Sequence, residues 1–346
     1  MTRLTTFPTT ALPTSLVLAT ALCFALSLGS AGNTAAAQGD QPGVVLQGGE
    51  GPGDGKHIVF VIGDEEYRSE ESMPQLAKIL AKRHGFKCTL LFATNKETGL
   101  VDPMTLDNIP GLDALQDADL MVMFLRFRRL PEEQMQKILD YTNSGRPILA
   151  LRTSTHAFKY PAKSPLAKWS WRSKDPKGGY GRAVLGETWI AHHGHHNVES
   201  TRALPSEGQA DHPVLRGVGE IWGPSDVYKI TTLSGDSKPI LDGHVLTGMK
   251  PDDPINREKP TMPVAWTKTY TGTEGKTSTV FTTTMGHSGD LKDADFRRLL
   301  VNACYWLTGL DVPEKADVEL VGTYDPLPIG YGKYRQGVRP EDHQLQ

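Results

Sequence analysis

Cysteine is scarce in this sequence, with three residues in a chain of 346 and no CxxC pair. Cys23 lies in an apolar run near the N-terminus, Cys88 in the strand-like stretch FKCTLLF, and Cys304 in a stretch with helical spacing. Thiols inside apolar elements are more often small buried hydrophobic residues than halves of a bridge. The cysteine pattern therefore excludes a disulfide framework and a thiolate metal site.

The chain also lacks the motifs of several enzyme classes and any strong excess of charge. No Walker loop or GxGxxG opens a helix, and neither a GxSxG elbow nor an HExxH occurs. The formal net charge is only −3, so no basic footprint is available for nucleic acid and no charged patch for a membrane surface. We therefore expect neither a nucleotide nor a nucleic acid as a partner.

A long hydrophobic run is missing as well. The apolar stretch at residues 16–28 is too short for a stable membrane span. Arg3 is the only charge before Asp40, and small residues ending in Ala37 follow the apolar stretch. This pattern predicts a signal peptide over residues 1–37, cleaved near Ala37, and export to the periplasm or the medium. A retained membrane anchor is the less favoured alternative.

The pattern of elements after the N-terminal region indicates an α/β domain over residues 56–310. Residues 38–55 are rich in glycine and lack periodicity, which predicts a flexible linker. A strand at 57–62 is followed by a helix that opens with a capping box at Ser72 and stops at Gly85, and then by a strand at 86–92. The unit repeats with a strand at 119–125, a helix at 131–141 and a strand at 147–151. Alternation of this kind predicts a doubly wound, mostly parallel sheet.

The second half of the chain is less regular. Residues 157–225 carry many tryptophans, histidines, glycines and prolines without a clear period, as functional segments often do. Residues 262–270 and 278–284 are predicted to pair as strands across the turn GTEGK, and residues 293–307 to form a closing helix. The tail, residues 311–346, is expected to be extended and loosely held.

Polar clusters follow four of the predicted strands. They lie at residues 64–67, 126–128, 152–156 and 286–288. Because ligands of an open α/β sheet bind at the carboxyl ends of its strands, we expect these clusters to share one rim. Each also has a simpler interpretation: carboxylates at a helix start, arginines that pair with them, hydroxyls that cap a helix, and structural histidines.

Residues 191–197 read AHHGHHN, with four histidines around Gly194. His192 and His196, or alternatively His193 and His195, have spacings found in zinc sites, and a carboxylate from Asp64 or Glu66 could complete three ligands. Acid–base chemistry without a metal is an equal alternative, because imidazole titrates near neutral pH. Imidazoles that bind sugar hydroxyls are the third. The sequence leaves these three open.

Four stretches together resemble the ThuA-like (trehalose utilisation) family. They are RPILALRTSTHAF at 146–158, HPVLRGV at 212–218, MPVAWTKTY at 262–270 and VFTTTMGH at 280–287. The resemblance implies a flavodoxin-like fold of the class I glutamine amidotransferase-like superfamily, in an exported bacterial branch, and a role in carbohydrate catabolism, including 3-keto sugars or their glycosides. It does not imply glutaminase activity, because Leu151-Arg152-Thr153-Ser154 stands where amidotransferases carry the nucleophilic cysteine.

The sequence thus predicts an exported protein that acts on a small carbohydrate as a hydrolase or lyase, with no stable membrane span. A non-catalytic carbohydrate-binding or scaffolding domain on the same fold is the alternative. The candidate catalytic residues are His192, His196, His287, His156, Asp64 and Glu66. The candidate substrate-binding residues are Arg152, Arg126, Tyr67, Thr153 and Trp189. His192 and His196 are the candidate ligands if a divalent metal, zinc or iron, is used.

Overall fold

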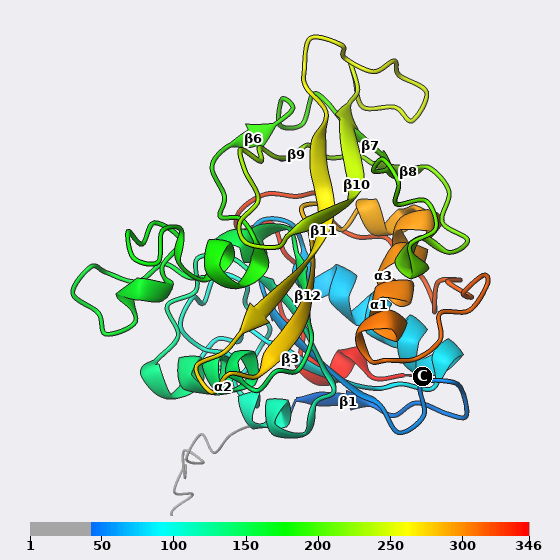
Figure 1. The fold of residues 1–346 in the computed structure, drawn as a ribbon. Helices are drawn as coiled ribbons and strands as arrows, with labels where there is room; N and C mark the ends of the chain where they lie inside the picture. Colours follow the sequence, from blue (N-terminus) through cyan, green and yellow to red (C-terminus); the bar gives the residue numbers. More distant parts are fainter. Residues whose placement is uncertain (1–42, 346) are drawn as a thin grey trace, which may run out of the picture. The chain divides into compact units, whose positions relative to one another are not determined.

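The structure, a computed structural model, describes residues 43–345. It contains a ten-stranded mixed sheet in the order β1-β3-β2-β4-β5-β12-β11-β10-β7-β8 (Figure 1). The strands are β1 Val44–Leu46, β2 His57–Gly63, β3 Lys87–Phe92, β4 Leu120–Leu125, β5 Ile148–Leu151, β7 Thr201–Pro205, β8 Ile221–Gly223, β10 Lys238–Val245, β11 Met262–Thr271 and β12 Thr277–Thr283. The short strands β6 His192–His193 and β9 Val227–Tyr228 form a separate pair.

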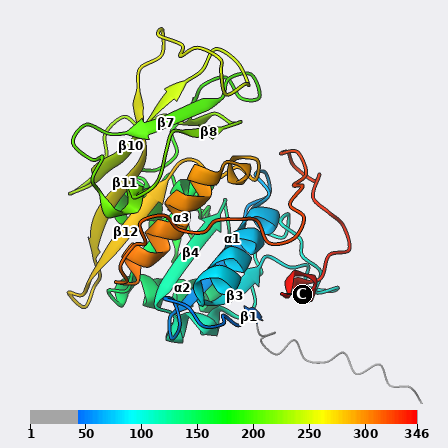
Figure 2. The same ribbon diagram turned by 90° about the vertical axis from the view of Figure 1, so that its right-hand side faces the viewer.

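The centre of the sheet is parallel, as the alternation of strands and helices predicts. Strands β3, β2, β4, β5 and β12 run in one direction, whereas β1 at one end and β11, β10, β7 and β8 at the other are antiparallel to their neighbours. Helices α1 Ser69–His84 and α3 Ala294–Leu307 lie on one face, and α2 Glu132–Asn143 lies on the other (Figure 2). The predicted doubly wound α/β fold is confirmed.

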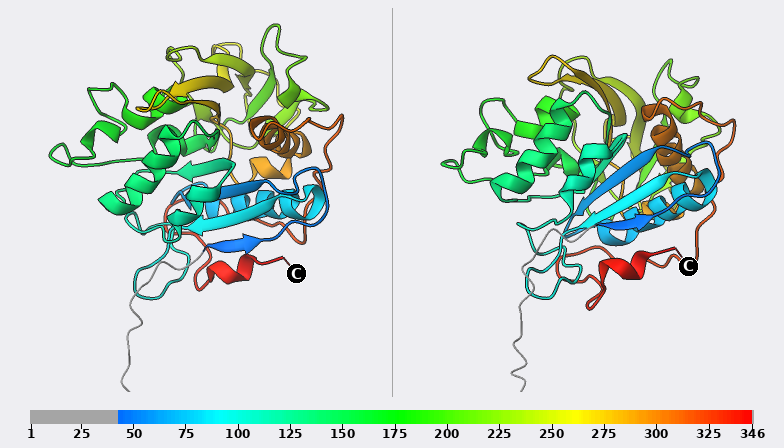
Figure 3. Two further views of the ribbon diagram at one scale, coloured as in Figure 1. Left: turned by 60° about the horizontal axis from the view of Figure 1, so that its bottom comes forward. Right: turned by 90° about the horizontal axis from the view of Figure 1, so that it is seen from below.

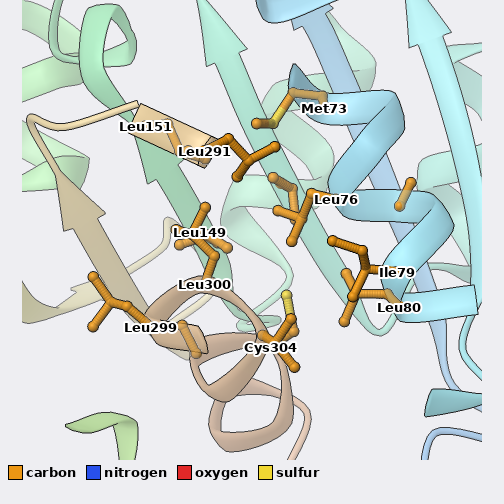
Figure 4. Close-up of a cluster of buried hydrophobic side chains, with 14 of the residues drawn as sticks. Met73, Leu76, Ile79, Leu80, Leu149, Leu151, Leu291, Leu299, Leu300 and Cys304 are labelled. Atoms are coloured by element: carbon orange, nitrogen blue, oxygen red, sulfur yellow. The ribbon is translucent and has the colours of Figure 1, made fainter. Parts of the chain in front are cut away.

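Side-chain alternation in the strands explains why both faces are covered. In β2, Ile58, Phe60 and Ile62 point into the core under α1 and α3, while Val59 and Val61 point into the core under α2. A strand buried on both faces is apolar over a continuous run, as IVFVI at 58–62 is. Figure 4 shows the first core, where side chains of α1 and α3 meet those of β5. Both Cys88 and Cys304 are buried and free, as expected.

The start of α1 differs from the capping box predicted at Ser72. The helix begins three residues earlier, at Ser69, and Pro74 lies inside it. Arg68 is the N-cap in a left-handed conformation, with φ of 62°. The Ser72 hydroxyl donates back to the Arg68 carbonyl oxygen at 3.3 Å and caps nothing. The helix ends at Gly85 in the left-handed conformation, as predicted.

The second half of the domain extends the sheet. Strands β11 and β12 form the predicted hairpin, and α3 begins with Asp293 as its N-cap, whose carboxylate accepts the N–H groups of Asp295 and Phe296. The stretch expected to be irregular, residues 157–225, nevertheless supplies β6, β7 and β8. These strands were missed because each has only two to five residues, too few to show a period.

Both ends of the described chain are more ordered than the sequence predicts. The linker expected over 38–55 contains β1, which pairs with β3 through Val45 opposite Thr89. The tail is extended but is tied to the domain, and its last turn, Pro340–His343, lies beside the edge of the sheet at β1 (Figure 3). The His343 ring stacks on Phe92 there, with ring centres 4.9 Å apart. The predicted signal peptide and its cleavage site lie outside the described residues, and within residues 43–345 no helix has the length and hydropathy of a membrane span.

Candidate active site

The four predicted polar clusters share one rim of the sheet. Strands β2, β4, β5 and β12 are adjacent and parallel, so their carboxyl ends lie at the same edge. Asp64, Arg126 and Arg152 follow the first three of these strands within one residue, and His287 follows the fourth after a short loop. The histidine segment reaches the same rim, because His196 Nε2 lies 3.9 Å from Oε1 of Glu66 in the loop after β2.

Asp226, immediately before β9, links the two histidines of the predicted metal or acid–base pair. Its carboxylate accepts from His192 Nδ1 through Oδ2 and from His196 Nδ1 through Oδ1 at 2.9 Å. Gly194 lies between them with φ of 105°, and a Cβ there would come within 3.1 Å of the Asp226 Cβ. The turn therefore needs glycine to bring both rings to one carboxylate. His193 points elsewhere, with its Nε2 on the Pro260 carbonyl oxygen at 2.7 Å.

The charge of Asp226 is strongly stabilised. Burial alone would raise its pKa, but the hydrogen bonds from His192 and His196 and the charge of Arg152 outweigh burial and hold the pKa well below the ordinary range. In return, the hydrogen bond to Asp226 raises the pKa of His196, although burial opposes it. An ionised carboxylate accepts N–H from Nδ1 of both rings, which leaves both Nε2 atoms for other partners.

Arg152 occupies the turn directly after β5, where the amidotransferases have their nucleophile. Its φ is 43°, in the left-handed region, which is a strained conformation for a residue with a side chain. The guanidinium is fully buried, lies 3.8 Å from the centre of the Tyr67 ring and donates to the Asp226 carbonyl oxygen at 2.8 Å. Neither Arg152 nor Tyr67 reaches the surface. Arg152 contacts Asp226, and the Tyr67 ring packs against the Arg152 guanidinium.

Asp64 and Thr153 are likewise internal. Thr153 donates its hydroxyl to Asp64 Oδ2 at 2.7 Å, and the backbone N–H of Glu66 donates to Asp64 Oδ1 at 2.9 Å. Both side chains have no solvent-exposed surface. Asp64 therefore orders the loop that carries Glu66.

Glu66 is the carboxylate that approaches the histidines. Its Oε1 lies 3.9 Å from His196 Nε2, and its Oε2 lies 3.3 Å from Arg126 Nη2. Arg126 is partly exposed and also pairs with Glu65, which in turn accepts from the buried Arg128 at 2.6 Å. Glu66 and Arg126 thus remain at the rim with the histidine pair.

His287 and His156 lie nearby in environments that keep them neutral. Burial and the charge of Arg152 lower the pKa of His287 to about 3, and its Nδ1 accepts from the Gly289 N–H at 2.8 Å. Burial and the charges of Arg126 and Arg152 hold the pKa of His156 well below its ordinary value. Both imidazoles are therefore uncharged near neutral pH, which distinguishes them from His196, whose pKa is raised.

Partly exposed aromatic rings continue the rim beyond the histidines. Trp189 lies 5.8 Å from the His192 ring, Trp171 lies 5.5 Å from Trp189, and Phe127 lies 5.3 Å from Trp171, between ring centres. Flat apolar faces beside polar groups suit the faces of sugar rings. Trp189 is partly exposed at this rim, whereas Tyr67 is buried.

The histidine pair and Asp226 also satisfy the distance test for a metal site. One donor atom from each of His192, His196 and Asp226 lies within 4.8 Å of the others, and no other group of three such residues within residues 43–345 does so. Two imidazoles and a carboxylate are a donor set that zinc and iron accept. The residues present fit such an ion.

Sequence reasoning missed three members of this site. Asp226 is 30 residues from His196, Asp290 accepts the backbone N–H groups of Gly286 and His287, and Tyr331 in the tail contacts Glu66. Asp226 could have been found only from the pairing of His192–His193 with Val227–Tyr228, which it precedes. These two-residue strands are too short to be recognised in the sequence. Nothing in the sequence of the tail separates Tyr331 from its neighbours.

Together these features define a doubly wound α/β protein with a buried arginine in the turn after β5. The family model described as ThuA, trehalose utilisation, matches residues 58–307. The chain therefore belongs to the ThuA family, which has a carbohydrate-related role.

Two solved structures described as ThuA-like proteins have limited similarity to this chain. A protein from Parabacteroides merdae described as ThuA-like is 14% identical, with 84% of this chain and 99% of that chain covered and a TM-score of 0.48. One from Bacteroides uniformis with the same description is 14% identical, with 75% and 93% covered and a TM-score of 0.46. The comparison with curated proteins finds no match.

Proposed function

We propose that this protein is an exported enzyme that acts on a sugar or a 3-keto-glycoside by acid–base chemistry of His192 and His196. The observation that carries the proposal is the single buried Asp226 carboxylate that accepts from Nδ1 of both rings. A carboxylate behind a histidine fixes its tautomer and stabilises its imidazolium form, which is what a general acid or base requires.

The chemistry of a 3-keto-glycoside suits such a pair. The ketone acidifies the C2–H bond, so one imidazole can take this proton as a base. As the C1–O bond breaks, the other imidazole, protonated, gives its proton to the departing oxygen. The product is an unsaturated keto sugar, and addition of water across its double bond would complete a hydrolysis. In that addition the first imidazole would return its proton to C2 and the second would take a proton from the water, while Glu66 would stabilise the protonated form of His196 from beside Nε2.

The remaining groups would bind and shield the substrate. Trp189, Trp171 and Phe127 offer apolar faces to the sugar rings, and Arg126 offers N–H donors to hydroxyl or keto oxygens. Arg152 would act as the counter-charge that keeps Asp226 ionised, and the Tyr67 ring would hold the guanidinium in place.

A divalent ion is the second form of this proposal. His192, His196 and Asp226 would hold zinc or iron, and the ion would polarise a sugar oxygen. Metal analysis of the purified protein separates the two forms. About one equivalent of zinc or iron, lost in His192→Ala and His196→Ala, supports the metal-assisted form, and metal-free protein with full activity supports the form without it.

The deciding experiment is turnover of 3-keto-glycosides by separate alanine variants of His192, His196 and His287. His195→Ala is the matched control, because this exposed histidine lies in the same loop outside the pair. Loss of activity in the first two variants but not in the control is expected. If all three site variants turn over substrate as fast as the wild type, the assignment is wrong.

Carbohydrate binding without catalysis is the second candidate function, favoured by the aromatic rings and by the absence of a nucleophile after β5. Calorimetric titration with a glycan panel, with product analysis in parallel, distinguishes the two. Binding without any product formed would favour the second candidate.

A further inference from the structure

The C-terminal segment, defined here as residues 324–335, lies outside the part of the chain that the family model matches, yet it is fixed to the rim. Tyr324 donates its hydroxyl to the Ser288 carbonyl oxygen at 2.7 Å, and the Gly330 N–H donates to the Glu66 carbonyl oxygen at 2.9 Å. The buried Arg68 donates through Nε to the Pro328 carbonyl oxygen at 3.0 Å. The segment is thus anchored to the two loops that carry Glu66 and His287.

Tyr331 in this segment joins two charged groups of the site. Its hydroxyl accepts from Arg126 Nη2 at 2.6 Å and donates to Glu66 Oε2 at 2.9 Å, and its ring lies 5.1 Å from the Arg126 guanidinium. The tyrosine is 52% exposed, so its ring contributes little to the core. Gly330 precedes it with φ of 131°, a conformation open to glycine, which lets the chain turn at this point.

These contacts decide where the other oxygen of Glu66 points. Tyr331 and Arg126 hold Oε2, and this leaves Oε1 3.9 Å from His196 Nε2. A glutamate side chain has three rotatable bonds, so a carboxylate without such partners samples several directions. A site of this kind works only when its groups are held within a fraction of an ångström of the productive arrangement.

We propose that Tyr331 is a positioning residue, whose hydroxyl orients the Glu66 carboxylate toward His196, and that the C-terminal segment is thereby part of the active site. The effect on turnover rests on the proposed function, whereas the orientation of Glu66 does not. The rival interpretation is that Tyr331 only fastens the segment and serves stability.

The test compares Tyr331→Phe with Tyr334→Phe. The control loses a hydroxyl from the same segment, but Tyr334 donates to Asp102 Oδ1 at 2.8 Å and has no contact with Glu66 among those of the described residues. Crystal structures of both variants and of the wild type give the distance from Glu66 Oε1 to His196 Nε2. Turnover of p-nitrophenyl 3-keto-β-glucoside gives kcat and KM, and thermal unfolding gives stability.

In Tyr331→Phe we expect Glu66 to leave its place beside His196 and kcat to fall roughly ten- to a hundredfold, as for a lost hydrogen bond to a charged group, with KM nearly constant. Tyr334→Phe should keep the Glu66 position and kcat. In a Glu66→Gln background, Tyr331→Phe should cause little further loss, because the two changes remove one interaction.

Two outcomes would overturn the proposal. One is a Glu66 carboxylate that stays in place in Tyr331→Phe, and the other is an equal loss of kcat in both phenylalanine variants. Should the wild type not turn over the keto-glucoside at all, the proposed function fails on that substrate, and the crystal structures alone still decide whether Tyr331 orients Glu66.

Discussion

Substitution of Asp226 by asparagine tests the centre of the site most directly. Asparagine has nearly the same shape but no charge, and its amide nitrogen cannot accept a hydrogen bond. It can serve one histidine at most, where the aspartate accepts from both His192 and His196. The buried Arg152 guanidinium, 3.6 Å from Asp226 Oδ1, would at the same time lose its anionic partner.

The size of both effects follows from this environment. Removing one member of a buried charge pair costs about 3–5 kcal/mol, and both Asp226 and Arg152 are buried. Because the folded pKa of Asp226 lies below its ordinary value of 3.8, this stabilisation is fully present above that pH and is lost only as the pH falls through the folded value. For catalysis, a mispositioned acid or base lowers kcat by roughly 100- to 10,000-fold. The pKa of His196 should fall, since the hydrogen bond that raises it is gone.

Asp290→Asn is the matched control for this experiment. Asp290 is also buried in the site, but it accepts from the backbone N–H groups of Gly286 and His287 rather than from the histidine pair. Burial raises its pKa to about 6, so at pH 5 the residue is largely neutral and asparagine replaces it with little electrostatic change.

Urea unfolding and keto-glycoside turnover at pH 5 and pH 7 provide the measurements. Asp226→Asn should lose stability and kcat at both pH values, and Asp290→Asn should lose little at pH 5. An Asp226→Asn protein with wild-type stability and activity would refute the reasoning, because no other described carboxylate bonds both imidazoles.

The parts of the fold that sequence predicted are those with local causes. IVFVI at 58–62 is a continuous apolar run, as a strand buried on both faces requires, and the helix that follows ends at Gly85 as expected. The order of strands and helices along the chain was enough to predict that four polar clusters lie at the carboxyl ends of parallel strands. Hence the rim, the histidine segment and Glu66 could be named from the sequence.

The features that could not be predicted from the sequence depend on contacts between residues far apart in the chain. Tyr331 and Glu66 are 265 positions apart, and Asp226 meets His192 through a two-residue strand pair without a period. Helix α1 starts early because Arg68 takes a left-handed conformation while its side chain reaches the tail, a tertiary effect that local capping signals do not contain. Tertiary contacts of this kind also turned the expected loose tail into a fixed part of the domain.

Two further predictions concern Glu70 and Gly194. Burial raises the pKa of Glu70 from its ordinary 4.5 to about 8, so the folded state favours the protonated carboxyl. The contribution of this preference to the free energy of unfolding is on the order of 5 kcal/mol; it is fully present below pH 4.5 and is lost as the pH rises through 8. Glu70→Gln should therefore raise the melting temperature at pH 9 but not at pH 4, and an equal effect at both would contradict this account. Gly194→Ala should destabilise the protein by about 1–3 kcal/mol and reduce kcat, because φ of 105° strains an alanine and the new methyl group crowds the Asp226 Cβ at 3.1 Å. Gly208→Ala is its control: φ there is 72° but nothing lies within 4 Å of the added carbon, so the backbone cost should appear in urea unfolding without a loss of kcat. An identical loss of kcat in both alanine variants would show that Gly194 has no special role in bringing the two histidines to one carboxylate.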